Sequence, residues 1–342
     1  MLKQKAEQIL TFLTPYIKNK ASSLNALAKK AIVSLKTYFT SWWQIALAAF
    51  GIIVFLYYPL GGWLIHKIDT TSYQAQTTDG KLGTIDTISY LINREVHYKI
   101  WTPNLPFVFP SYFLDNMPAF QKGIMSSVAK TAHSLDGLKL TIASDSAANN
   151  LSEGASLLQY PADIWLFSPK NKLIPAPSSP TQYKKGRKKL NNFNREVSAG
   201  KTDIARTPDN LSLILYVIKK DLNKNMLQTE KHIRENSSSF FDFKSDDVFY
   251  FSVGKLYAYE QILNALGIDF KPVLIKYDIY SNWVSMTKAL ENATKLAPMI
   301  IRNAQTSSSF APNHLVAVNY YNAKALNSLN AIINKLKQHT EQ

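Results

Sequence analysis

The longest uncharged stretch of the chain runs from Thr37 to Ile65 and holds 29 residues without a formal charge. A helix needs about 20 mostly apolar residues to cross the hydrocarbon core of a bilayer. Amphipathic aromatic residues favour the two membrane–water interfaces. Such residues lie near both ends of this stretch: Trp42, Trp43, Tyr57, Tyr58 and Trp63. The pattern therefore predicts a transmembrane anchor over residues 37–65.

Two other interpretations of this stretch are weaker. A buried helix of a soluble protein seldom stays uncharged for so long with aromatic residues at both ends. A cleaved signal peptide needs its apolar region before the cleavage site, but the Ala46-Leu47-Ala48 pattern follows polar residues and the apolar run continues beyond it. We expect an uncleaved anchor, with Pro59 and Gly61-Gly62 letting the chain leave the helix axis.

Residues 1–36 form a basic segment with seven lysines and one acid, Glu7. In residues 66–100, four basic residues balance four acidic ones. Positive charge favours the cytoplasmic side of a membrane, so we expect a cytoplasmic N-terminus and residues 66–342 on the far side. In a Gram-negative cell that places the anchor in the inner membrane and residues 66–342 in the periplasm.

The same basic segment has the apolar spacing of an amphipathic helix, which Pro15 should break or kink. A basic amphipathic helix next to an anchor suits an anionic lipid surface. A mitochondrial presequence, the competing interpretation, would be rich in arginine, and no arginine precedes Arg94.

Helical spacing dominates the rest of the chain, with start and stop signals at several points. We expect helices over residues 85–100, 117–135 and 281–296, and further helices that begin at Thr207-Pro208, Ser245 and Ala311-Pro312. Gly267 should end the helix that begins at Ser245, as a left-handed cap. Strand-like residues occur only as short, isolated runs at 139–142 and 162–167. The sequence predicts an all-α protein: one transmembrane helix, then a multi-helix, mostly antiparallel domain.

A proline-rich stretch at residues 169–182 interrupts this pattern as a long surface loop or a subdomain boundary. The residues that follow are basic, and residues 170–195 hold eight basic residues and no acid. This basic stretch is either a solvated helix face or a contact for anionic lipid headgroups or an acidic partner. Its candidate residues are Lys184, Lys185, Arg187, Lys188 and Lys189. Nucleic acid is not an expected partner, because the domain lies outside the cytoplasm and no aromatic residues alternate with the cations.

A second candidate surface is an aromatic segment that prolines prevent from forming a continuous helix. Its residues are Trp101, Phe107, Phe109, Tyr112 and Phe113, interspersed with three prolines. The segment is either a loop packed over the helical core or a loop that binds a partner or the membrane surface, since aromatic residues dominate interface hot spots.

Composition mainly excludes chemistry. The chain has 342 residues, a net charge of +15, no cysteine and twelve glycines. The absence of cysteine excludes thiolate metal sites and a cysteine nucleophile. Gly200-Lys201-Thr202 resembles the end of a phosphate-binding loop, but Arg195 occupies the position that requires glycine. The six histidines form no local metal motif. We predict no catalytic, cofactor-binding or metal-binding residues.

The charge divides along the predicted topology. Seven of the 39 basic residues and one of the 24 acidic residues lie in residues 1–36, which leaves 32 basic and 23 acidic residues for the domain beyond the anchor. Part of the net charge is therefore a topology signal, and part comes from the basic stretch. The acids Asp115, Asp209 and Asp247 each lie at an expected helix start, where a carboxylate stabilises the helix dipole.

Several motifs resemble an uncharacterised bacterial family, domain-of-unknown-function family 2333. The resemblance spans about residues 50–336 and is most specific in two segments, Trp101–Phe107 and Leu114–Gln121. Shorter similar motifs are Tyr58–Gly61, His66–Asp69, Thr207–Leu211, Asp247–Tyr250, Asp269–Leu274 and Asn313–Leu315. The chain departs from the family pattern at Leu105 and Ala119. The resemblance implies a single-span inner-membrane protein with a helical periplasmic portion and without assigned catalytic residues.

The functional expectation is a non-enzymatic scaffold or adaptor that contacts other envelope proteins. One alternative is a protein that cleaves or binds peptidoglycan, with a carboxylate among residues 95–121 and two carboxylates facing each other across a cleft. Another alternative is a lipid-binding module with an apolar tunnel between its helices.

Overall fold

The structure is a computed structural model that describes residues 2–65, 67–73, 80–103, 105–142, 144–167, 174–236, 242, 244–298, 301–303 and 313–340. The chain divides into two compact units, Met1–Leu60 and Gly61–Gln342. The prediction of a mostly helical protein is confirmed, since the elements described are almost all helices.

The first unit is one helix, α1 (Leu2–Ile65), whose last turn belongs to the second unit. It contains a segment long and apolar enough to cross a membrane, Lys18–Ile65, of which few residues are buried. The expectation that the chain leaves the helix axis at Pro59 and Gly61-Gly62 is wrong, because the helix includes these residues and runs to Ile65. Pro15 also lies inside the helix and does not break it. A proline removes one backbone hydrogen bond, and apolar surroundings favour keeping the remaining ones within the helix.

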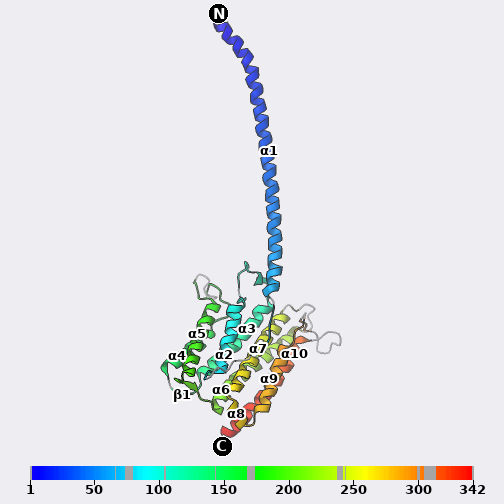
Figure 1. Ribbon diagram of the computed structural model, residues 1–342. Coiled ribbons are helices and arrows are strands. Elements are labelled where there is room, and N and C mark those ends of the chain that lie inside the picture. Colours follow the sequence, from blue (N-terminus) through cyan, green and yellow to red (C-terminus); the bar gives the residue numbers. More distant parts are fainter. Residues whose placement is uncertain are drawn as a thin grey trace. The chain divides into compact units, whose positions relative to one another are not determined.

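The second unit is a bundle of helices packed side by side (Figure 1). α2 (Gly83–Asn93) and a π-helical turn at Arg94–Tyr98 precede the aromatic segment, which ends in a 3₁₀ turn at Pro110–Phe113. The others are α3 (Asn116–Asp136), α4 (Asp145–Leu158), α5 (Ser179–Ser198), α6 (Pro208–Asn236), α7 (Ser245–Asp269), α8 (Lys271–Lys276), α9 (Tyr280–Thr294) and α10 (His314–Thr340).

Helix α7 is the centre of the core. Most of its residues are buried, and it packs against α2, α3 and α9. At the crossing with α3, Gly254 approaches so closely that an added Cβ would lie 2.2 Å from the carbonyl oxygen of Phe120. Gly123 on α3 makes the reciprocal approach to the carbonyl oxygen of Phe251. The two glycines thus allow the backbones of α3 and α7 to touch.

The ends of these helices agree with most of the predicted signals. Asp115 accepts a hydrogen bond from the backbone of Asn116 at the start of α3, and Thr207 accepts one from the backbone of Asn210 in α6. The prediction that Gly267 ends its helix is wrong. α7 continues to Asp269, and Gly267 lies where an added Cβ would meet the indole of Trp283 at 2.5 Å. The predicted start of the last helix, at residues 311–312, lies outside the described residues.

The run at 139–142 contributes β1 (Leu140–Ile142), which pairs antiparallel with β2 (Asp203–Ile204). The run at 162–167 contributes only a bridge between Phe167 and Pro175. Of the proline-rich stretch, residues 168–173 lie outside the described residues. The stretch ends in α5, because the helix already begins at Ser179.

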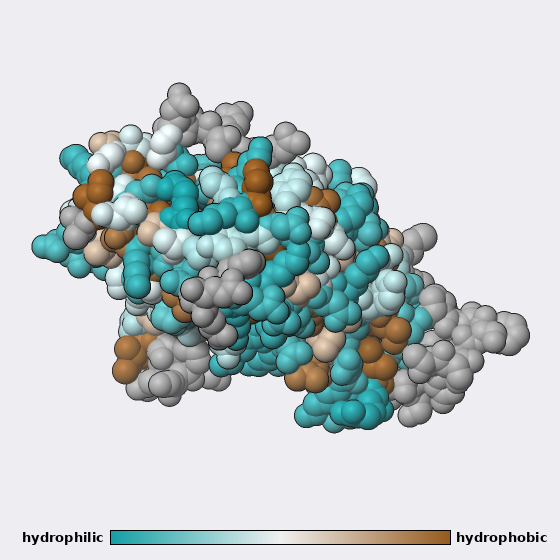
Figure 2. Space-filling view, turned by 90° about the horizontal axis from the view of Figure 1, so that it is seen from below, coloured by the Kyte–Doolittle hydropathy of each residue, from teal (hydrophilic) through white to brown (hydrophobic). Residues whose placement is uncertain are grey.

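The lower end of the bundle in Figure 1, seen from below in Figure 2, is mostly hydrophilic with scattered apolar residues. The end of the second unit that contains the last turn of α1 instead carries exposed apolar residues, and the first candidate surface lies there.

Candidate functional site

A buried polar network fixes the start of the aromatic segment. Nε of Arg94 lies 2.6 Å from a carboxylate oxygen of Glu95, and a guanidinium nitrogen of Arg94 donates to the hydroxyl of Tyr257 at 2.6 Å. The amide of Gln121 donates to the other carboxylate oxygen of Glu95 at 3.2 Å and accepts from the backbone of Thr102 at 2.9 Å. The network ties the π-helical turn to α3 and α7, so the segment after it leaves the bundle at a fixed point.

Trp101 is a packing residue rather than a surface residue. Its side chain is only 6% exposed, and its indole nitrogen donates to the carbonyl of Ala162 at 3.1 Å. The indole also packs edge-on against the ring of Tyr183 at 5.3 Å. Trp101 therefore packs over the core and is not part of the exposed surface.

The rest of the aromatic segment is more open. Phe107 is 67% exposed and Tyr112 is 54% exposed, whereas Phe109 is half-buried. The side chain of Phe113 lies outside the described residues. Pro110 packs against Gly61 and Leu114 lies near Gly62, so this part of the segment covers the last turn of α1.

These residues are among the exposed apolar residues on the chain segments that meet at one end of the second unit, and we call this set of residues the apolar end surface. Lys99 donates to the carbonyl of Lys67, and Trp101 bonds to Ala162, so the neighbouring chain segments gather at the same end. The residues of the surface are Trp63, Leu64, Tyr98, Ile100, Phe107, Val108, Tyr112, Trp165, Leu166, Phe167 and Ile174. An apolar surface rimmed by polar residues marks a site of protein or membrane interaction.

The basic stretch divides into two sets of residues. Lys184, Arg187 and Lys188 line a pocket of about 550 Å³ between α2 and α5. Lys185 and Lys189 do not line it, and Lys189 instead forms a 2.5 Å ion pair with Glu153. The structure thus brings three of the five predicted residues together.

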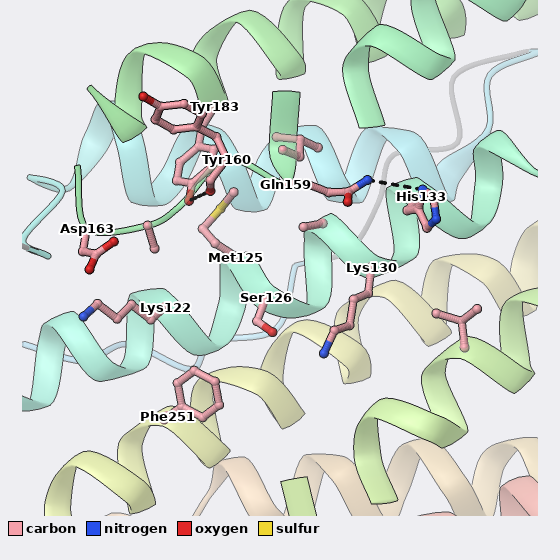
Figure 3. Close-up of a pocket in the computed structure, with 14 residues that line it drawn as sticks. Lys122, Met125, Ser126, Lys130, His133, Gln159, Tyr160, Asp163, Tyr183 and Phe251 are labelled. Carbon is pink, nitrogen blue, oxygen red and sulfur yellow. Dashed lines mark hydrogen bonds between the residues drawn. The ribbon is translucent and has the colours of Figure 1, made fainter. Parts of the chain in front are cut away.

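A groove of about 540 Å³ runs along the exposed side of α3 (Figure 3). Lys122, Ser126 and Lys130 project from this helix, while Tyr160 and Tyr183 lie on the opposite side of the groove. Gln159 and His133 are hydrogen-bonded at 3.3 Å along its edge. Most of the remaining lining is apolar, so the groove offers an apolar surface with lysines along one side.

Lys130 reaches from the groove to a buried ion pair of Asp221 and Lys255, and we call these three residues the charged triad. Asp221 on α6 accepts from Lys255 at 2.7 Å and from the hydroxyl of Tyr259 at 2.8 Å, and it also pairs with Lys130. Burial, together with the nearby ammonium groups of Lys255 and Lys224, lowers the pKa of Lys130 to about 7. Burial also lowers the pKa of Lys255 to about 8. Two amino groups share one carboxylate, which makes it easier for one of them to lose its proton.

Sequence reasoning missed this triad, although a signal was present. Asp221 lies on the apolar stripe of its helix, between Ile218 and Leu222, and Lys255 adjoins Leu256 in a helix that is apolar on most faces. A charged residue at such a position is buried only when it is paired. The two members on α6 and α7 could thus have been identified as partners.

Glu95 and the three acids at expected helix starts have structural roles. Glu95 is held by Arg94 and Gln121, and Asp115 caps α3. Asp209 and Asp247 each lie in the first turn of a helix, as expected. Burial, and then the charge of Asp115, raise the pKa of Asp247. Within the described ranges, no three His, Asp or Glu side chains gather in a way that could hold a metal ion.

Comparison with known proteins gives one match. Residues 213–341 match the sequence model of a family described as an uncharacterized protein conserved in bacteria. The family is DUF2333. The predicted resemblance is thereby confirmed for the C-terminal part of the chain, including the motifs at residues 247–250, 269–274 and 313–315. No curated protein and no solved structure matches the chain significantly.

The DUF2333 match includes most of α6 and all of α7 to α10. It therefore contains Asp221 and Lys255 of the charged triad, and also Tyr259, whereas Lys130 lies outside it. The segments Trp101–Phe107 and Leu114–Gln121, on which the resemblance chiefly rested, also lie outside the matched residues.

Proposed function

We propose that the protein is a single-pass protein of a bacterial inner membrane, with a cytoplasmic N-terminus and with residues 66–342 in the periplasm. Its helical unit serves as a non-enzymatic scaffold or adaptor that rests on the bilayer and contacts other envelope proteins. The observation that carries this proposal is the continuity of the apolar end surface with the last turn of α1, where Trp63 is 75% exposed.

The physical argument follows from where a span must end. Trp63 and Leu64 are exposed apolar residues at the C-terminal end of the candidate span. Aromatic side chains at such a position favour the membrane–water interface. Pro110 and Leu114 contact this turn, and in this proposal the nearby Phe107 and Tyr112 also meet the interface. Transfer of the exposed aromatic rings from water to the interface then lowers the free energy.

The absence of cysteine from the sequence makes the topology directly testable. Single variants Lys20→Cys and Lys201→Cys place one thiol on each side of the proposed span. In intact spheroplasts, a membrane-impermeant maleimide should label the variant at position 201, and the variant at position 20 should react only after lysis. The opposite labelling pattern, or equal labelling of both variants, would contradict the proposed orientation.

Contact with the bilayer can be measured in the same background. Phe107→Cys carries a bimane label in nanodiscs that contain lipids with a spin-labelled headgroup region, and Ile275→Cys provides an exposed apolar control in α8. Bimane at position 107 should be quenched several-fold more strongly than at position 275. Equal quenching at both positions would mean that the apolar end surface does not rest on the membrane.

The adaptor role is tested by isolating the protein from cells after crosslinking, in mild detergent. We expect a reproducible complex that is lost when Phe107 and Tyr112 are both replaced by Ser, with a Leu213→Ser/Tyr216→Ser variant as the matched control on exposed positions of α6. Recovery of the wild-type protein as a lone monomer would contradict the scaffold proposal and leave the bilayer contact intact.

The groove on α3 supports a second candidate function, binding of a lipid or another amphiphilic anion. The groove is an open channel, whereas the lipid-binding alternative from the sequence had a tunnel between helices. Lys130, which lines the groove, shares the carboxylate of Asp221 with Lys255. Butyl phosphate should bind with an affinity that Lys130→Met lowers at least fivefold, while butanol should not bind. Equal affinity for the two compounds would exclude a role for the charge.

A further inference from the structure

The pocket between α2 and α5 gathers cationic side chains from α5 and from the segment before α2. Five of its side chains carry a positive charge, and one carries a negative charge. The cations are Lys81, Lys184, Arg187, Lys188 and Arg195, and the acid is Asp86. We call this site the basic pocket. The sequence indicated three of these cations within a linear basic stretch, but not the wall that α2 provides.

The positive charge of the basic pocket is not neutralised by the surrounding protein. Among the residues that the structure describes, no carboxylate lies within ion-pair distance of Lys81, Lys184 or Lys188. Asp86 accepts a hydrogen bond from the hydroxyl of Tyr73 at 3.1 Å. Holding several like charges around one concavity raises the electrostatic energy of the empty pocket, and a bound anion lowers it.

The helical register explains why these side chains converge. Positions 184, 187, 188, 191 and 195 recur at spacings of three and four residues, so they lie on one face of α5. That face lines the pocket opposite Asp86 and Ser89 of α2. Lys185 lies on another face of the same helix and is exposed. The charge of the pocket therefore reflects a specific face rather than a uniformly basic helix.

The chemistry and length of this face indicate the kind of anion. Lysine and arginine side chains are donors without acceptors, and the fork of an arginine binds a phosphate or carboxylate through two hydrogen bonds. Asn191 and Asn192 add amide groups to the lining. The face from Lys184 to Arg195 is about 16 Å long at 1.5 Å per residue, so a single phosphate cannot contact the cations at both of its ends.

We propose that the basic pocket binds an anion that carries two or more phosphate groups. The volume of about 550 Å³ is within the range of small-molecule sites. Two sources supply this chemistry, a soluble polyphosphorylated compound and a lipid with two phosphates in its headgroup. The inference is independent of the scaffold proposal, because it rests on charges that lie outside the apolar end surface.

The test uses the full chain in nanodiscs and two probes, tripolyphosphate and cardiolipin. Tripolyphosphate is titrated calorimetrically into nanodiscs of pure phosphatidylcholine. In the second arm, native mass spectrometry counts the cardiolipin molecules retained by protein released from nanodiscs that contain cardiolipin. A soluble ligand predicts saturable binding in the first arm, and a lipid ligand predicts retention in the second.

Two double variants with the same loss of charge decide whether the pocket is responsible. Lys184→Met/Lys188→Met removes two pocket lysines, and Lys185→Met/Lys220→Met removes two exposed lysines that do not line the pocket. The pocket variant should weaken binding at least tenfold, and the control variant less than threefold. Equal weakening by both variants, or no saturable binding in either arm, would overturn the proposal. All four positions are solvent-accessible, so circular dichroism should show both variants folded like the wild type.

Discussion

Asp221 and Lys255 form an ion pair of 2.7 Å in which the two side chains are only 2% and 3% exposed. Lys130 reaches the same carboxylate from α3, so one side chain joins three helices, α3, α6 and α7. A buried ion pair contributes little net stability compared with apolar residues, but removing one partner leaves the other charge without compensation. The arrangement therefore makes the bundle dependent on a single carboxylate.

Replacing that carboxylate should destabilise the second unit strongly. Asp221→Asn leaves Lys255 buried without a counter-charge, and we expect a loss of about 3–5 kcal/mol in the free energy of unfolding. Guanidinium unfolding of the full chain in detergent, followed by far-UV circular dichroism, measures this loss. Asp209→Asn, an exposed acid in the first turn of the same helix, should cost no more than about 1 kcal/mol. Equal losses in the two variants would mean that the triad contributes no more to the free energy of unfolding than an exposed acid at a helix start.

The triad should also give the protein a characteristic pH dependence. The pKa of Lys130 is about 7 in the folded protein and 10.5 in its ordinary state, so between these values the unfolded chain binds more protons than the folded one. Stability should therefore rise with pH from about 7 toward 10, and the dependence on this group should level off below about 7, where Lys130 is protonated in both states. Lys130→Met should reduce this rise, whereas Lys122→Met, which removes another lysine of the groove, should retain it. Identical slopes in the two variants would contradict the assignment.

The anchor and the helices could be predicted because their signals are local. A run of 29 uncharged residues is one continuous stretch of sequence, and a proline after Thr207 and an acid at Asp115 each act within one or two turns of helix. The error at Gly267 shows the limit of local signals. A glycine there resembles a helix cap, yet its function is to make room for Trp283, a residue 16 positions later in the chain.

The candidate surfaces were predicted in part, because burial depends on partners distant in sequence. Trp101 and Phe107 have the same aromatic signature, but only Trp101 finds Ala162 and Tyr183 against which to pack. Likewise, Lys184 and Lys185 are adjacent in sequence, and only the face that carries Lys184 meets α2. Neither distinction follows from periodicity along the chain alone.

The crossing of α3 and α7 should not tolerate a side chain at Gly254. An alanine there would place its Cβ 2.2 Å from the backbone carbonyl oxygen of Phe120, and a backbone atom cannot rotate away as a side chain can. Gly254→Ala should destabilise the protein by about 2 kcal/mol or more, since overpacking of a core costs typically 1–3 kcal/mol. Gly137→Ala is the matched control, because its added Cβ would approach no heavy atom closer than 3.8 Å. Thermal unfolding followed by circular dichroism separates the two variants, and an unchanged melting temperature for Gly254→Ala would mean that the helices do not cross so closely.

The aromatic segment should separate into a stability residue and a surface residue. Trp101→Leu removes the hydrogen bond to Ala162 and the ring contact with Tyr183, and it leaves a cavity, so we expect a loss of about 2–3 kcal/mol in unfolding free energy. Phe107→Leu, at an exposed position, should change stability by less than about 0.5 kcal/mol. Limited proteolysis adds a local measurement, because release of Trp101 frees residues 105–113 for cleavage while the Phe107 variant stays as resistant as the wild type. If Phe107→Leu were the more destabilising change, the exposed ring would have a packing role, and the proposed contact between the apolar end surface and the bilayer would lose its main residue.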